Sequence, residues 1–204
     1  MRFAMPAIAV ASAVLISSGA HADVSSAYTD LDAEKDCTTF SAPAEGEEGG
    51  DWANLVCNGH RGYPVFIYYG DVRESLFYGH PPGGDLAPVW ESFDAFNRAG
   101  PRIEWRLDDS SGHKVPFATI HRWFVSDPED PDIETEVLVV EKVGQPFERE
   151  GCVVGYVVAT GNPNANDKAR RIADGQARDF ACGADQPAID QGTVPVPSFN
   201  RVAQ

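Results

Sequence analysis

The sequence predicts an α+β fold in which a mostly antiparallel sheet, a meander, carries helices on one face and is stapled by disulfides. Three observations support this prediction. Short apolar strands alternate with polar turns through the second half of the chain, as in a meander. A stretch with helical periodicity follows the last strand. Four cysteines come after an export signal, and an even number in an exported chain favours disulfides.

Residues 1–22 have the pattern of a secretory signal peptide. Arg2 precedes an apolar run from Ala7 to Ile16, and Ala20-His21-Ala22 is a small-x-small cleavage site. No later segment has the roughly 20 apolar residues that a membrane span needs. We therefore expect a soluble mature chain that begins at Asp23, is located in the periplasm or outside the cell, and does not insert into a membrane.

The charge of the mature chain narrows the classes of partner. The full chain has a net charge of -15. Removal of Arg2 with the signal peptide makes the net charge of the mature form one unit more negative, at -16. Such a surface repels nucleic acid and anionic headgroups and attracts cationic partners. A role in solubility alone is the simpler alternative. The 43% hydrophobic content favours a folded core, which we assign to one domain over residues 23–190.

In the first half of the domain, the sequence pattern predicts a set of strands that contains two of the cysteines. We expect short strands at 37–40 and 52–57, joined by an acidic, glycine-rich loop over 41–51. The stretch 63–69 is dense in aromatic and β-branched residues and is predicted to be central in a sheet. A further strand is expected at 74–78.

A shorter middle helix is predicted over residues 86–96. Its apolar residues recur at intervals of three and four, as on one face of a helix; they are Leu86, Val89, Trp90, Phe93 and Phe96. Gly100-Pro101 ends the pattern. Beyond it, Ile103, Trp105 and Leu107 alternate with charged residues, which predicts a half-buried strand.

The second half predicts three more strands and a C-terminal helix. The strands are expected at 116–125, 137–143 and 152–159. The helix is expected over 163–181, with Asn162 as its cap. Its narrow apolar stripe consists of Ala165, Ala169, Ile172, Ala173, Ala177 and Phe180. Residues 191–204 contain two prolines and no periodicity, so we expect an extended or mobile tail.

Matched lengths predict a disulfide between Cys152 and Cys182. The strand from Cys152 rises about 26 Å, at about 3.3 Å per residue, and the helix returns about 28 Å, at about 1.5 Å per residue. The second cysteine therefore comes back to the level of the first, as a disulfide requires. Cys37 and Cys57 form the other predicted pair. A zinc site is the alternative, but no C-x-x-C is present.

The catalytic motifs of common enzymes are missing from the sequence. It contains no G-x-S-x-G, no H-E-x-x-H and no phosphate-binding glycine loop, and we predict no cofactor and no metal. His121 is the one candidate for acid-base catalysis, because it lies in a predicted strand beside Arg122 and Trp123. A hydrogen-bonded histidine at the edge of the core is the favoured reading.

Two further patterns are candidate sites. Trp105-Arg106 and Arg122-Trp123 lie on neighbouring predicted strands, which predicts a cation-π brace or a recognition patch that uses Arg106, Arg122 and Trp123. The acids from Asp127 to Glu134 could surround a calcium ion. This run lacks the glycine of an EF-hand loop and contains two prolines, so a solvated loop is favoured.

Two functional hypotheses follow. The preferred one is a noncatalytic, monomeric envelope protein that binds a partner, either a cationic protein or a small ligand. The alternative is an enzyme of unfamiliar type that uses His121 with a carboxylate as acid and base.

Overall fold

The computed structural model describes residues 24–44, 46, 50–83, 89–110 and 112–203. The predicted signal peptide lies outside these residues. Within them, no helix is long and apolar enough to cross a membrane.

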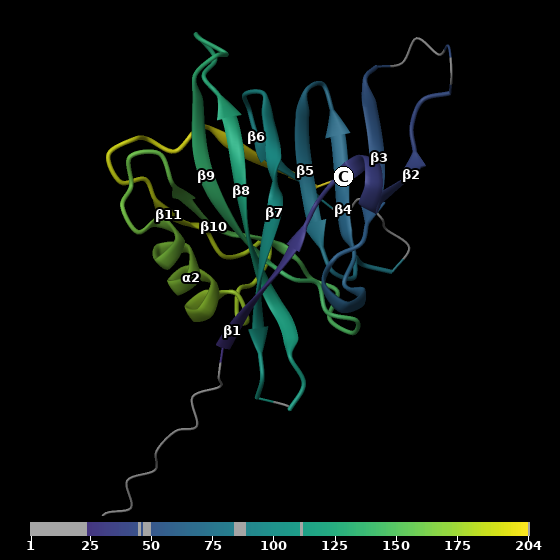
Figure 1. Cartoon of the computed structure of the whole chain (residues 1–204), viewed down its shortest axis with the longest axis vertical. Helices are drawn as coiled ribbons and strands as arrows, with labels where there is room; N and C mark the ends of the chain where they lie inside the picture. Colours follow the sequence, from purple (N-terminus) through teal and green to yellow (C-terminus); the bar gives the residue numbers. More distant parts are fainter. Residues whose placement is uncertain (1–23, 45, 47–49, 84–88, 111, 204) are drawn as a thin grey trace, which may run out of the picture.

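Four strands form an antiparallel meander at one side of the molecule (Figure 1). They are β2 (Cys37–Ser41), β3 (Trp52–Cys57), β4 (Val65–Gly70) and β5 (Arg73–Tyr78). A one-turn helix, α1 (Ala33–Asp36), precedes them, and a short 3-10 helix, His60–Gly62, joins β3 to β4. The aromatic-rich β4 lies between β3 and β5, which confirms its predicted central place.

A second sheet of six strands has the order β1-β7-β8-β9-β10-β11. Its strands are β1 (Val24–Asp30), β7 (Asn97–Asp108), β8 (Val115–Ser126), β9 (Glu134–Lys142), β10 (Cys152–Val158) and β11 (Ala188–Asp190). Only the short β11 pairs in the parallel direction, with β10. The predicted meander through the second half of the chain is therefore confirmed.

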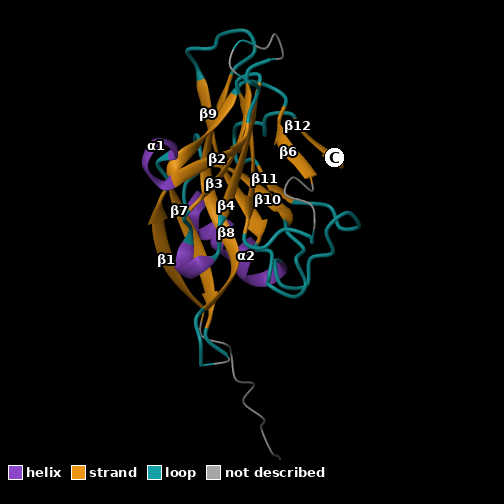
Figure 2. Ribbon diagram, turned by 90° about the vertical axis from the view of Figure 1, so that its right-hand side faces the viewer, coloured by secondary structure: helices purple, strands orange, loops and turns teal. Residues whose placement is uncertain are grey.

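The two sheets share one apolar core, and the helix α2 (Ala165–Gln176) covers a second one. The first core combines β4 and β5 residues such as Val65 and Tyr78 with β7 residues such as Ile103 and Trp105. Ile103, Trp105 and Leu107 are all buried, as their alternation predicts. The second core packs the alanine stripe of α2 against the outer face of the six-stranded sheet, which Figure 2 shows from the side.

Both predicted disulfides are present. Cys37 and Cys57 are direct cross-strand neighbours in β2 and β3. Cys152 at the start of β10 bonds Cys182 after α2, and their Cα atoms lie 5.8 Å apart. Neither cysteine pair leaves a free thiol.

The predicted C-terminal helix is present but shorter than expected. It begins after Asn164, which has a positive φ of 62°, and not at Pro163. The Asn162 amide instead donates to Asp190. Turns follow the helix up to the cysteine, so the antiparallel return of the chain was predicted correctly and the extent of the helix was not.

The predicted middle helix over residues 86–96 is wrong. Residues 84–88 lie outside the described part, and the remainder forms a strand, β6 (Val89–Phe93), followed by a turn into β7. β6 pairs antiparallel with β12 (Phe199–Ala203), which comes from the predicted tail. Phe93 is buried against the rings of Trp123 and Tyr156. Pairing with a segment about 100 residues away thus overrides the local periodicity.

Candidate functional site

The structure places the predicted site residues on two different faces of the six-stranded sheet. These residues are Arg106, His121, Arg122 and Trp123. Side chains alternate between the two faces of a strand, so His121 and Trp123 of β8 enter the core between the sheets. Arg122 points to the outer face, where Arg106 of β7 also lies. The described cation-π pairs use Phe124, Tyr28 and Phe117 and no tryptophan. The proposed arginine–tryptophan brace is therefore not formed.

His121 is a fully buried core histidine with a hydrogen bond at each ring nitrogen. Its Nδ1 lies 2.7 Å from the Tyr78 hydroxyl, and its Nε2 lies 2.6 Å from the Gly100 carbonyl oxygen. A neutral ring that donates from Nε2 and accepts at Nδ1 satisfies both bonds. Burial lowers the pKa of His121 to about 4. This environment favours the structural role that the sequence analysis preferred.

Two carboxyl groups lie in the same core region and were missed from sequence. Glu141 of β9 is buried, and burial followed by repulsion from Glu91 raises its pKa well above the ordinary value. Glu91 of β6 accepts a hydrogen bond from the backbone of Val153, 2.9 Å away, and faces Arg201 of β12. Burial also raises the pKa of Glu91. The available signal was a glutamate at an inward position of an apolar strand.

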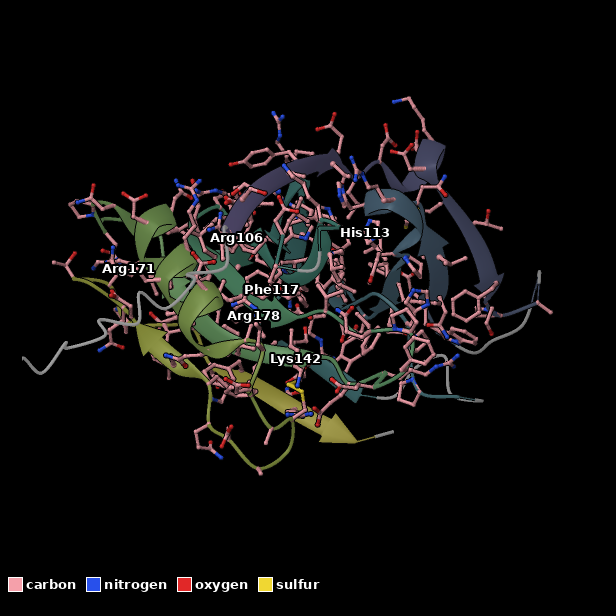
Figure 3. The ribbon with its side chains drawn as sticks, turned by 90° about the horizontal axis from the view of Figure 1, so that it is seen from below. Arg106, His113, Phe117, Lys142, Arg171 and Arg178 are labelled. Atoms are coloured by element: carbon pink, nitrogen blue, oxygen red, sulfur yellow. A yellow bond between two sulfur atoms is a disulfide. The ribbon has the colours of Figure 1, made fainter. Side chains whose placement is uncertain are left out.

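The outer face of the six-stranded sheet carries a network of arginines and carboxylates beside α2. Glu104 is buried and bonds Arg170 of the helix through both of its oxygens, at 2.8 and 3.0 Å. Arg106 bonds Asp174 of α2 through two parallel contacts of 2.7 and 2.8 Å. Burial acts to raise the pKa of Glu104, but bonds from Arg170 and Ser26 lower it overall. Arg106 therefore anchors the helix to the sheet (Figure 3).

A hollow of about 200 Å³ lies beside this network, near the first turn of α2. Its apolar lining includes Ile120, Phe124 and Leu138, and Tyr28 of β1 stands at its edge. Arg102 and Arg122 supply cationic groups to the lining. Of the predicted binding residues, Arg122 thus lines a concave surface, whereas Arg106 is not part of its lining.

A second hollow, of about 290 Å³, lies near the other end of α2. The Arg178 guanidinium stacks on the Phe117 ring at 3.7 Å and donates to Asp108. Lys142 lines the same hollow and bonds Glu150 and the Phe180 carbonyl. Figure 3 shows these cationic groups on the face that α2 occupies.

One end of the molecule gathers turns from both sheets, at the top of Figure 1. Backbone hydrogen bonds link the turns in sequence: Asp71 donates to Asp51, Asn97 donates to Val72, and Ser126 donates to Phe96. We call this end, formed by Asp51 next to β3 and by the β4–β5, β6–β7 and β8–β9 connections, the acidic end. Among the described residues, its exposed carboxylates are Asp51, Asp71, Asp94, Asp127, Glu129, Asp130 and Asp132.

The acidic end also exposes large apolar side chains. Val72, Phe96 and Ile133 are 47%, 50% and 56% exposed. A hollow of about 210 Å³ lies between Phe96 and the prolines Pro128 and Pro131, with Asp94 and Asp127 in its lining. Hydrogen bonds from Ser198 and Asn200 hold the pKa of Asp94 below its usual range. The surface therefore combines exposed apolar side chains with exposed carboxylates.

The acidic loop does not form a calcium-ligand cluster. The Asp127 carboxylate accepts from the backbone of Glu129 and Asp130 and so shapes its own turn. In the part of the chain that the structure describes, no three histidine, cysteine or acidic side chains gather as a metal site.

Comparisons with protein-family models, curated proteins and solved structures found no match to this chain.

Proposed function

We propose that this chain is an exported, noncatalytic binding protein whose acidic end docks a cationic protein. One observation carries the proposal: the acidic end combines exposed apolar side chains with exposed carboxylates. Apolar side chains at the centre of a contact and charges at its rim are the usual anatomy of a protein interface. The charge of -15 on the whole chain would steer a basic partner toward it.

The charge balance at this end supports a cationic partner. Arg73 bonds Asp71 at 3.3 Å, and Arg98 bonds Glu134 at 2.8 Å. The seven exposed carboxylates named above outnumber these two arginines. Both disulfides are typical of proteins that function in oxidising compartments, which supports export.

The test is a capture experiment on the mature protein with envelope extract, in low and in high salt. A captured basic protein is then purified, and its Kd for the mature chain is measured by calorimetry. We expect the affinity to fall as salt screens the charges. The proposal is contradicted if nothing is recovered above background. It is also contradicted if the affinity of every recovered partner is independent of the salt concentration.

Matched variants locate the contact. Glu129→Gln with Asp132→Asn removes two charges at the acidic end, and Glu148→Gln with Asp179→Asn removes two exposed charges elsewhere. The first pair should weaken binding by about two- to fivefold per charge at low salt, and the second pair should have much less effect. Phe96→Ser should weaken binding in low and high salt alike. Equal effects of the two charge pairs would place the contact elsewhere.

The core histidine gives the enzyme hypothesis little support. His121 bonds a tyrosine and a backbone carbonyl, and it does not line any of the three hollows described above. The binding hypothesis is the one that the exposed surface favours.

A further inference from the structure

The hollow beside the first turn of α2 exists because β7 is irregular there. The register between β7 and β8 shifts between Ala99 and Ile103. Gly100 lies inside this shift, and a Cβ atom at its position would come within 2.9 Å of the Arg122 carbonyl oxygen. Glycine therefore allows the two strands to approach closely at the edge of the hollow. Asn166 of α2 supplies the opposite wall.

The floor of this hollow is apolar and small. Ile120, Phe124 and Leu138 contribute side chains from two adjacent strands, and the Tyr28 ring adds an exposed aromatic edge. Its volume of about 200 Å³ is below the roughly 300 to 1,000 Å³ of pockets that hold drug-sized molecules. The hollow therefore suits a compact molecule, the size of one substituted ring.

The carboxylates around the hollow are already neutralised by arginines. Glu104 bonds Arg170 at 2.8 Å, and it lies 3.4 Å from Arg106. Glu136 bonds Arg122, and Glu134 bonds Arg98 at 2.8 Å. Each of these acids has a guanidinium partner, so the hollow offers little to a cationic ligand.

Unlike the arginines named above, Arg102 has no close carboxylate partner among the described residues. Its Nε lies 4.0 Å from Asp30, and both side chains are mostly exposed, at 68% and 84%. Its guanidinium also lies 5.2 Å from the centre of the Tyr28 ring. An exposed pair at this distance is worth little, so the Arg102 fork can bind an incoming carboxylate without breaking a strong bond.

We propose that this hollow is a binding site for a small carboxylate with a compact apolar body. The apolar body rests on Ile120, Phe124 and Leu138, and Arg102 binds the carboxylate. Arg122, held by Glu136 and by Asn166 at 3.5 Å, lines the other side. This site lies on the sheet face that carries α2, and the proposal does not depend on docking at the acidic end.

Three probes of one shape test the charge preference. The mature protein, labelled with ¹⁵N, is titrated with phenylacetate, phenylacetamide and benzylamine while amide shifts are followed by NMR. We expect the largest shifts around Ile120, Leu138 and Asn166, and the tightest binding for phenylacetate. Equal or tighter binding of benzylamine, shifts centred on Phe117 at the other hollow, or no saturable shift would each overturn the proposal.

Two variants separate the roles of charge and shape. Arg102→Gln should weaken phenylacetate by about tenfold, the size of one charge-assisted hydrogen bond, and leave phenylacetamide unchanged. Arg149→Gln, on an exposed loop, is the matched control and should change neither. Asn166→Trp places a large ring on an exposed wall position and should abolish binding of both. Equal effects of the two arginine variants, or full binding to the tryptophan variant, would contradict the site.

Discussion

The direction of each side chain along β8 decides what its residues can do. His121 and Trp123 enter the core, while Arg122 between them reaches the outer hollow. These three neighbours in sequence therefore belong to two different environments. His121 is fully buried, and its hydrogen-bond partners are Tyr78 and Gly100.

The buried histidine makes the fold sensitive to acid. The pKa of His121 is about 4 in the folded chain, against an ordinary 6.5, so the unfolded chain takes up a proton first. The stabilisation is complete above pH 6.5 and is lost as the pH falls toward about 4, which amounts to about 3 kcal/mol. We expect urea unfolding between pH 4 and 7 to show this loss in the wild type and in His113→Gln, and not in His121→Gln. Parallel profiles for all three proteins would contradict this assignment.

At the scale of elements, the ribbon of β6 and β12 closes the core beside β10. Phe199 of β12 stacks on Tyr156 of β10 with ring centres 4.1 Å apart, and Tyr156 also meets Phe93 of β6. Glu91 adds a bond to the Val153 backbone, next to a break in the β9–β10 register. The C-terminal segment is thus part of the folded unit.

Removing one ring should measure how much this ribbon contributes. Phe199→Ala should lower the free energy of unfolding by about 2 kcal/mol, somewhat below the usual cost for a fully buried phenylalanine, because Phe199 is only partly buried. Val202→Ala, on the same strand but 55% exposed, should cost less than about 0.5 kcal/mol. Chemical denaturation of both variants checks the difference. Equal costs would mean that β12 is not packed as described.

At the scale of the whole molecule, the core between the sheets carries ionisable groups with opposite pH dependence. Burial lowers the pKa of His121 and raises the pKa of Glu141. His121 disfavours folding in acid, and Glu141 disfavours folding as the pH rises. The free energy of unfolding should therefore be greatest at a pH between the ranges in which these two groups titrate.

Glu141 sets the alkaline side of this profile. The folded chain holds the Glu141 proton above the ordinary value of 4.5, so its stabilisation is complete below pH 4.5 and is lost as the pH rises through the folded pKa. The His121 effect is common to the wild type and Glu141→Gln, so we expect the Tm of the wild type to fall relative to the Tm of Glu141→Gln as the pH rises from 5 to 9. Glu148→Gln, an exposed control, should follow the wild type. A steeper fall in Glu141→Gln would contradict the assigned protonation.

Local signals in the sequence were enough to predict much of the architecture. Alternation predicted the inward residues of β7, and aromatic content predicted the central place of β4. Matching strand and helix lengths predicted the Cys152–Cys182 disulfide. These features depend on repeats of two or 3.6 residues and on chain dimensions, which are properties of neighbouring residues.

The site was less predictable, because contacts between distant segments decide it. β6 is a strand because residues 199–203 pair with it. Arg106 and Arg122 were identified from sequence, but their partners come from α2 and β9. Arg102 and Glu91 carry no local signature that separates them from ordinary surface charges, and the inward position of Glu141 in an apolar strand was the one available signal.

The sequence by itself determined the net charge, the cysteine pairs and most strands, because each depends on composition or on short-range spacing, and it predicts an export signal. The tertiary structure alone decided that the acidic turns meet at one end, that a hollow lined by Arg102 and Arg122 opens beside α2, and that His121 is buried. The physical reason is that the two surface sites and the burial of an ionisable group all depend on which segments, remote in sequence, pack together and exclude water.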